Sequence, residues 1–313
     1  MSQASFADLA YTHKKKLTRK ERFLTEMEQL LPWPQLLQPI LKRYPKPGQG
    51  RRPIRAEVLL RIYFLQQWYG LSDPAMEDHL YDSEAMRRFA QVDLEHIPDE
   101  TTLCKFRHFL EAHELTAALF RLTEQYLAER AVLVRMGTIV DATIISASGS
   151  TKNQAQARDP EMASTKKGRT WYFGLKAHIG SDLQGRVHRV VVTAASVHDS
   201  QVMAECCHGE EQVIYGDKAY ASAAGQQAAE ARGQTWRVHR KAKRGRRLTG
   251  ADRAFNRKSN RVRARVEHVF GVIKHLWGYR RGRYRGLAKN AAHLFTLFAL
   301  ANWYLVRREL AGT

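Results

Sequence analysis

Three acidic residues that are far apart in the chain stand where a carboxylate is unusual. Asp141 lies inside the apolar stretch TIVDATII, and Asp217 follows the short apolar stretch VIYG. Glu267 is the only acid between Arg253 and Arg308. Burying a charge among apolar residues is costly unless the charge is paired or binds a metal. Each acid is therefore either one half of an ion pair or a ligand for a cation.

Three carboxylates that converge would form a site for divalent metal. Carboxylates repel one another unless cations lie between them, and a set of oxygen ligands favours Mg²⁺ or Mn²⁺. Two such ions about 3.5–4 Å apart activate a water or a 3′-hydroxyl and stabilise the leaving oxygen of a phosphodiester. If the fold brings Asp141, Asp217 and Glu267 together, the chemistry expected is cleavage or transfer of phosphodiester bonds.

The stretch around Glu267 predicts one uninterrupted helix over residues 260–274, which read NRVRARVEHVFGVIK. At about 100° per residue its apolar side chains form one stripe. That stripe contains Val262, Val266, Val269, Phe270, Ile273, Leu276 and Trp277. Arg263, Glu267 and Lys274 project beside it, within about 60° of one another. The helix alone does not tell an ion-pair partner from a metal ligand.

The positive charge of the chain is concentrated in one tract. The formal net charge is +20, and residues 235–285 contain 18 Lys and Arg residues against two acids, Asp252 and Glu267. That tract therefore carries +16 of the +20. Charge gathered in this way indicates a nucleic-acid backbone as partner, because a surface that serves solubility alone would not segregate it.

The remaining composition indicates a protein of a reducing cytoplasm. Three cysteines, Cys104, Cys206 and Cys207, give neither a disulfide framework nor a zinc pattern. Residues 1–16 lack the apolar run of a signal peptide. The longest apolar run, residues 294–306, contains an Asn and is too short to span a bilayer. We expect no membrane segment and a helix buried in the core instead.

From residue 132 onward, stretches typical of strands alternate with helical ones. Strands are expected at 134–147, 171–179, 186–196, 212–215 and 235–239, with helices at 200–207 and 222–232, and a polar, mobile loop at 148–170. With the Glu267 helix last, this is the succession of a ribonuclease H-like fold, an α/β mixed five-stranded sheet with flanking helices. In that fold the first and fourth strands are neighbours and the last helix packs across them, so the three acids converge.

Residues 1–131 are predicted to be an all-α N-terminal domain that precedes a catalytic domain of residues 132–313. Helices are expected at 21–31, 56–69, 83–90 and 99–113, with another opened by Asp73, a turn at 32–34 and a basic linker at 42–53. The helix 99–113 would suit a helix-turn-helix reader of a DNA groove. Its exposed side chains would be Thr101, Thr102, Lys105, Arg107 and His108. A plain helical packing domain fits the same pattern.

At these residues the chain resembles bacterial DDE transposases of the insertion sequence five family. The family's helix signature is Arg, then Glu after three residues, then Lys or Arg after six more. Arg263, Glu267 and Lys274 match it. The family's DxT motif is matched by the DAT that begins at Asp141, and its second acid by GDKAY around Asp217. The resemblance covers most of the chain, including the helical N-terminal part.

The resemblance implies cut-and-join chemistry at the ends of a mobile DNA element. Water would free a 3′-hydroxyl at each end, and that hydroxyl would attack target DNA. Asp141, Asp217 and Glu267 would hold two Mg²⁺ ions, with Mn²⁺ as a substitute. The residues expected to contact DNA are Arg263, Lys274, Lys218, Asn260, Arg261, Lys105, Arg107, Arg280, Arg281 and Arg283. Asn260 stands where the family commonly has a Tyr.

The implied partners are the terminal inverted repeats of the element, bound by the N-terminal domain, and target DNA. Paired ends need paired active sites, so the resemblance implies a homodimer on DNA, in the bacterial cytoplasm and associated with the nucleoid. Two other classes stay open. A domesticated DNA-binding regulator has no need of three acids, and a structure-specific nuclease would use the same metals without joining.

A few further residues carry alternatives of their own. The loop that contains Asp159 and Glu161 is either a source of a fourth ligand or a flexible contact to DNA. For His178 and His188, on neighbouring strands, roles in the core are favoured over zinc binding. For Trp277, packing in the core is favoured over stacking on a base.

Overall fold

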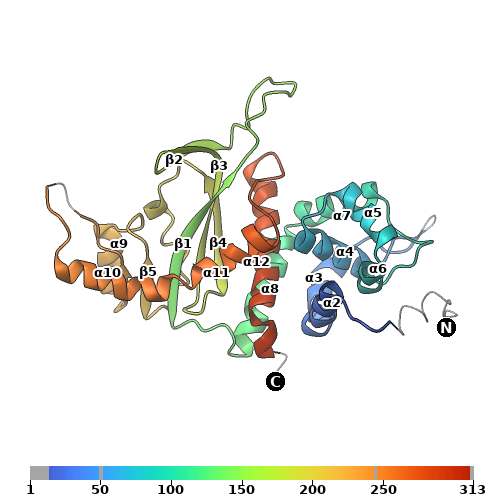
Figure 1. The fold of residues 1–313 in the computed structure, drawn as a ribbon, viewed down its shortest axis with the longest axis horizontal. Helices are drawn as coiled ribbons and strands as arrows, with labels where there is room; N and C mark the ends of the chain where they lie inside the picture. Colours follow the sequence, from blue (N-terminus) through green and yellow to red (C-terminus); the bar gives the residue numbers. More distant parts are fainter. Residues whose placement is uncertain (1–13, 49–51, 243–244, 311–313) are drawn as a thin grey trace.

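The structure is a computed structural model that describes residues 14–48, 52–242 and 245–310. Most of the N-terminal stretch without a signal-peptide pattern, part of the basic linker, and Lys243 and Arg244 of the basic tract lie outside the described residues. The sheet and the N-terminal helices lie on opposite sides of the long helix α12 (Leu287–Leu310), drawn in red in Figure 1. Among the described helices none has the length and apolar content to cross a membrane.

The N-terminal part is helical, as predicted. Its helices are α2 (Arg19–Leu30), α3 (Trp33–Leu41), α4 (Ala56–Tyr69), α5 (Asp73–Asp82), α6 (Glu84–Ala90), α7 (Glu100–Ala112) and α8 (Leu115–Glu129). The turn predicted at 32–34 is wrong, because Pro34 lies in the first turn of α3, where its missing N–H has no partner to lose. Ser72, not Asp73, caps α5 by accepting from the N–H of Ala75.

The sheet has the ribonuclease H-like order. Its strands are β1 (Gly137–Ser146), β2 (Ala163–Lys167), β3 (Thr170–Ser181), β4 (Val187–Ala194), β5 (Val213–Gly216) and β6 (Thr235–Val238). The order is β2-β3-β1-β5-β6, with β4 also paired to β3. β1, β3 and β4 are antiparallel, and β1, β5 and β6 are parallel. The predicted fold class is confirmed, with β2 as a sixth strand in the stretch expected to be a loop.

Alternation along β1 sends side chains to two different cores. Ile139 and Ile145 belong to the large core that also holds the apolar side chains of α12. Val140 points the other way, into a smaller core with Ile214 and Val238. Asp141 has the parity of Ile139 and Ile145, so it lies on the face of the sheet that packs against α11 and α12.

Helix α12 is apolar nearly all round because it is buried on both sides, against the sheet and against α8 and α2. Asn302, the amide in the predicted apolar run, is satisfied by β4. The amide accepts from the N–H of Val187 at 2.8 Å and donates to its carbonyl at 2.7 Å. Trp303 donates to the hydroxyl of Thr123 on α8 at 3.1 Å. The helix therefore joins the helical part to the sheet through one continuous core.

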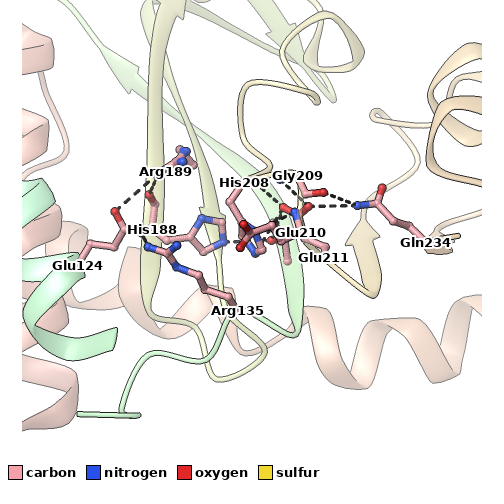
Figure 2. A network of polar contacts seen from close by, with 10 residues as sticks. Glu124, Arg135, His188, Arg189, His208, Gly209, Glu210, Glu211 and Gln234 are labelled. Carbon is pink, nitrogen blue, oxygen red and sulfur yellow. Dashed lines mark hydrogen bonds and ion pairs between the residues drawn. The ribbon is translucent and has the colours of Figure 1, made fainter. Parts of the chain in front are cut away.

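Ion pairs at the rim hold α8 against the sheet. Glu124 on α8 pairs with Arg135, just before β1, at 2.8 Å and with Arg189 on β4 at 3.7 Å (Figure 2). α9 (Ala223–Ala231) connects β5 to β6 on the far side of the sheet. The helix expected at 200–207 is wrong, because only a 3-10 turn, Asp199–Gln201, forms there.

A buried polar cluster lies beside these ion pairs (Figure 2). Glu211 is 2% exposed, yet its carboxylate accepts from the hydroxyl of Thr138 at 3.0 Å and from the N–H of Gly209 at 2.8 Å. Thr138 Oγ1 also lies 3.1 Å from Nε2 of His188. Because hydrogen bonds meet its charge and His208 Nε2 lies 3.6 Å from its Oε1, Glu211 can be buried without a Lys or Arg partner. His188 and His178 are core residues, as predicted.

Candidate active site

Asp141 and Asp217 lie side by side on neighbouring parallel strands. The pairing of β1 with β5 ends with Val140 opposite Gly216, so Asp141 within β1 lies next to Asp217, the first residue after β5. Adjacent strands are about 5 Å apart. Ligand sites of α/β sheets lie at the carboxyl ends of such strands. The predicted neighbourhood of the first and fourth strands is therefore present, and it brings these two acids together.

The helix that carries Glu267 is not continuous. α10 (Gly250–Arg263) ends before α11 (Val266–Gly271), and a π-helical turn, Val272–Leu276, follows. The prediction of one uninterrupted helix over 260–274 is wrong at Ala264 and Arg265, which keep helical backbone angles but lie where the N–H groups of Arg265 and Glu267 bond to the third residue back. Arg265 donates to the carbonyl of Leu183, and its own carbonyl lies where a Cβ on Gly185 would be only 2.6 Å away.

The π-helical turn also changes the predicted apolar stripe. A π-helix has more residues per turn than an α-helix, so side chains after it rotate around the axis. Leu276 is 56% exposed, contrary to prediction, whereas Val266, Val269 and Ile273 are buried as expected. Trp277 is also buried, which confirms its role in the core.

Arg263 joins two of the three acids. Its Nη1 donates to Oδ2 of Asp141 at 2.6 Å, and its Nη2 lies 3.6 Å from Oε1 of Glu267. The side chains of Arg263 and Asp141 are 17% and 16% exposed, whereas that of Glu267 is 65% exposed. A single guanidinium thus lies between a largely buried carboxylate and one that faces solvent.

The electrostatics of Asp141 reflect this crowding. Burial, with smaller contributions from the negative charges of Asp217 and Glu267, raises the pKa of Asp141 to about 6 in spite of the nearby Arg263. One oxygen of Asp141 also accepts from the N–H of Ala142 at 2.8 Å. Asp217 and Glu267 are therefore both close enough to Asp141 to act on its charge.

The donor types suit a hard divalent cation, although the three side chains do not surround one point. Within the described residues no group of three or more His, Cys, Asp and Glu side chains is arranged to hold a metal ion. The positive charge between Asp141 and Glu267 is supplied by Arg263. The residues fit Mg²⁺ in oxygen chemistry and in charge, since a cation would offset both the burial of Asp141 and its repulsion by Asp217 and Glu267.

Comparison with known proteins identifies the family. The family model described as "Transposase DDE domain" matches residues 133–303, more than half of the 313 residues. The chain belongs to the transposase DDE domain family. A second model, "Transposase domain (DUF772)", matches residues 12–109, so transposase domains match both the helical part and the sheet.

One solved structure, "Crystal structure of the Mos1 Strand Transfer Complex", also shows a similarity to the chain. The two chains are 10% identical, and the match covers 85% of this chain and 99% of that one. The TM-score is 0.21, and a likeness at that value tells nothing about the function of this chain.

The residues predicted to contact DNA, all cations except Asn260, fall into two groups in this family member. The first group is exposed and lies on the strand ends and helices that carry the acids. Lys218 is exposed next to Asp217, and Asn260 and Arg261 are exposed near the end of α10. Arg280 and Arg281 are exposed beyond the π-helical turn. There the backbone of Arg281 forms an isolated β-bridge with that of Ser146, at the end of β1.

Lys274 belongs to this group but is only partly exposed. Its Nζ donates to the carbonyl of Ile144 on β1 at 2.7 Å. Burial, with smaller contributions from the charges of Lys167 and Arg280, lowers the pKa of Lys274 to about 8. Lys274 therefore stands at the carboxyl-terminal half of β1, among other cations, with its charge only partly accessible.

The second group makes contacts within the chain. Arg107 pairs with Asp73 at 2.6 Å and stacks over Tyr284, with its Cζ 4.8 Å from the ring centroid. Arg283 donates to the carbonyls of Gly70 and Leu71 at 2.7 and 3.2 Å. These two side chains hold the N-terminal helices against the segment between the π-helical turn and α12. Sequence reasoning missed this role, because it depends on two segments that are distant in the chain.

Lys105 stays exposed on α7, where it lines a hollow of about 400 Å³ with Thr102 and Phe109.

The acids of the loop after β1 are neither placed as a fourth metal ligand nor left as a flexible contact to DNA. Asp159 accepts from the N–H of Gly286 at 2.6 Å, and Glu161 accepts from that of Leu287 at 2.8 Å. Carboxylates at a helix N-terminus are stabilising. The two acids therefore cap α12 from the loop that follows β1.

Proposed function

We propose that the protein is a DNA transposase of the insertion sequence five kind. It cuts phosphodiester bonds at the ends of its element and joins the freed 3′-hydroxyls to target DNA. One observation carries the proposal. Arg263 reaches both Asp141 and Glu267, beside Asp217 at the carboxyl end of β5. Three acids from two strands and a helix thus share a small region of a ribonuclease H-like sheet, and membership in the transposase DDE domain family supports the same function.

Asp141, Asp217 and Glu267 would hold the metal, Mg²⁺ with Mn²⁺ as a substitute. When bound, two ions would activate the attacking oxygen and stabilise the leaving one. Arg263 neutralises the carboxylates of the protein without metal, and it is the cation nearest to them that can bind a phosphate oxygen. The exposed side chain of Glu267 can reorient on α11 without unpacking the core, since the neighbouring Val266 and Val269 hold that helix.

DNA is the proposed partner because the cations gather at the same end of the sheet. Lys218, Asn260, Arg261, Arg280 and Arg281 are exposed, and we assign them to phosphate contacts. Arg263 and Lys274 would contact phosphates next to the cut. Lys105 would contact phosphates from the N-terminal helices. Arg107 and Arg283 would act indirectly, by orienting those helices through Asp73 and the carbonyls of residues 70–71.

The division of labour follows the predicted domains. Residues 1–131 would bind the inverted repeats, and residues 132–313 would perform the chemistry. Two ends must be cut together, so we propose a homodimer on DNA, in the bacterial cytoplasm and associated with the nucleoid. A domesticated regulator and a nuclease without joining are the rival functions.

One assay separates the three functions. Labelled element ends are incubated with the protein, Mg²⁺ and a supercoiled target. A transposase gives cut ends and joined product, a nuclease gives cut ends only, and a regulator gives a shifted complex only. Asp141→Asn and Glu267→Gln are expected to abolish cutting while DNA binding stays. Glu210→Gln, at an exposed acid in the turn before β5, is the matched control and should leave cutting unchanged. Mg²⁺-dependent cutting by Asp141→Asn would refute the assignment.

A further inference from the structure

β2 and the first part of β3 form a two-stranded arm that extends past the end of β1. The pairing of β1 with β3 ends with Ser146 opposite Gly174, whereas β2 continues along residues 170–174. A Cβ on Gly174 would lie 2.1 Å from the carbonyl oxygen of Ile145, so only glycine fits where the arm leaves β1. At about 3.3 Å per residue, Trp171 lies about 10 Å beyond that point.

The arm presents an indole among cations. Trp171 is 66% exposed, more than any other large hydrophobic residue described. Lys166 lies opposite it on β2, with Nζ 5.7 Å from the ring centroid. Lys167 and Arg169 are exposed, and among the described residues neither forms an ion pair or a side-chain hydrogen bond. The sequence has no acid between Glu161 and Asp182, so the arm attracts anions along its whole length.

Packing does not explain the exposure of Trp171. Two aromatic residues of the basic tract are covered, since Trp277 is 5% and Tyr279 2% exposed. They cannot stack on a base without unpacking the core. Stacking on exposed aromatic side chains, with cations along the backbone, is how proteins bind single-stranded nucleic acid irrespective of sequence. Trp171 supplies the ring, and its neighbours supply the charge.

The arm points away from the candidate active site toward the carboxyl end of β1, since Trp171 is eight residues along β3 from Ile179, the partner of Asp141, or about 26 Å. It leaves the sheet at the carboxyl end of β1, the end at which Asp217 follows β5. The charge of Lys167 contributes to lowering the pKa of Lys274, which itself binds the carbonyl of Ile144. A DNA strand that leaves the candidate active site toward that end would reach the arm after several nucleotides.

We propose that the arm binds unpaired nucleotides of a DNA end, with one base stacked on Trp171 and backbone phosphates on Lys166, Lys167 and Arg169. This rests on the proposed function, because a DNA end is the substrate of the candidate active site. It adds to that function a preference for ends that carry a single-stranded extension, and it assigns the preference to residues outside the acid triad and the basic tract of residues 235–285.

The test compares two probes of mixed sequence, a blunt duplex and the same duplex with a short single-stranded extension. Trp171→Ala is expected to weaken binding of the extended duplex by about 5- to 150-fold, the range for one stacked base. Binding of the blunt duplex should change less than about twofold. Trp171→Phe keeps a ring and should retain most of the affinity. Tyr81→Ala, at a ring that is 51% exposed on α5, is the matched control and should change neither.

Equal affinities of Trp171→Ala and the wild type for the extended duplex would overturn the proposal. The proposal would also be overturned if Trp171→Ala changed only the oligomeric state measured by sedimentation. That result would make Trp171 a contact between protein copies. Cutting by the wild type is measured in parallel. If the wild type cuts and joins but the arm variant binds normally, the arm inference fails and the function stands. If the wild type does not cut yet the variant loses the extended duplex, the arm inference stands and the function fails.

Discussion

Arg263 donates a hydrogen bond of 2.6 Å to Asp141, a residue 122 positions earlier in the chain. The same guanidinium lies 3.6 Å from Glu267. One cation therefore holds a strand carboxylate and a helix carboxylate together. A protein whose acids bind divalent metal needs such a partner when metal is absent, because three unpaired carboxylates would repel one another.

Replacing Arg263 by Ala should destabilise the protein in the absence of metal. Loss of one partner leaves Asp141 with its charge largely buried and unpaired, and we expect a cost of about 1–3 kcal/mol, less than for a fully buried pair. Arg263→Lys keeps the charge and should cost less. Thermal unfolding with and without Mg²⁺ measures this, and Mg²⁺ should restore more stability to Arg263→Ala than to the wild type. Equal melting temperatures without Mg²⁺ would contradict the role assigned to this arginine.

Lys274 should contribute to DNA binding in a way that depends on pH. Its pKa is lowered to about 8, so its charge is lost as the pH rises through about 8. The affinity difference between the wild type and Lys274→Ala should therefore shrink above that pH, whereas Lys274→Arg should keep its affinity. Titration of a labelled duplex at several pH values measures the difference. Arg121→Ala, at an exposed cation on α8, serves as control. A difference that does not vary with pH would count against the perturbed lysine.

Affinity for DNA should fall steeply with salt. If six to ten phosphates are contacted, it should drop about 10³-fold or more between about 50 and 200 mM salt. Replacing Arg280 and Arg281 by Ala should reduce the slope of log affinity against log salt by about two. Fluorescence anisotropy at a series of salt concentrations gives both slopes. A flat response of the wild type would argue against the basic tract as a phosphate-binding surface.

Stability should decrease as the pH falls below about 6.5. Burial lowers the pKa of His188 and of His293 to about 3 and that of His178 to about 4. The folded state then binds fewer protons than the unfolded state between those values and about 6.5, so protons favour unfolding. Each histidine should cost up to about 2 kcal/mol near pH 5, at about 1.4 kcal/mol per pKa unit.

Urea unfolding at a series of pH values measures this loss. His188→Gln should show a shallower dependence than the wild type, whatever its stability at neutral pH. His113→Gln, at an exposed histidine, should keep the dependence of the wild type. Identical pH dependence in His188→Gln and the wild type would mean that His188 does not titrate differently in the folded and unfolded states.

The sheet could be predicted from sequence because its strands carry their own pattern. The β-branched run around Asp141 and the apolar stretch before Asp217 each predict a strand. The first strand contains a charged residue and the second is followed by one, and packing explains neither charge. β2, by contrast, reads ASTKK, with no apolar alternation. It is a strand only because β3 offers it a partner, and such pairing is not visible in five residues taken alone.

Other differences from the sequence-based expectations have the same origin in contacts between distant segments. Nothing in residues 260–274 breaks a helix, yet it is divided where Arg265 contacts Leu183 and Gly185. The sequence places the two acids at 159 and 161 near metal or DNA, whereas the structure uses them to cap α12. The sequence does not single out Trp171, because its exposure follows from the end of β1 at Ser146, which periodicity does not reveal.

The central claim is that the carboxylates of Asp141, Asp217 and Glu267 share divalent metal. The most direct test titrates Mn²⁺ into the protein bound to a DNA end and follows the free ion by its electron paramagnetic resonance. The account predicts that Asp141→Asn, Asp217→Asn and Glu267→Gln each weaken Mn²⁺ binding by about tenfold or more, since each removes an oxygen ligand, and that Glu210→Gln does not. Wild-type affinity for Mn²⁺ in any one of the three triad variants would contradict it.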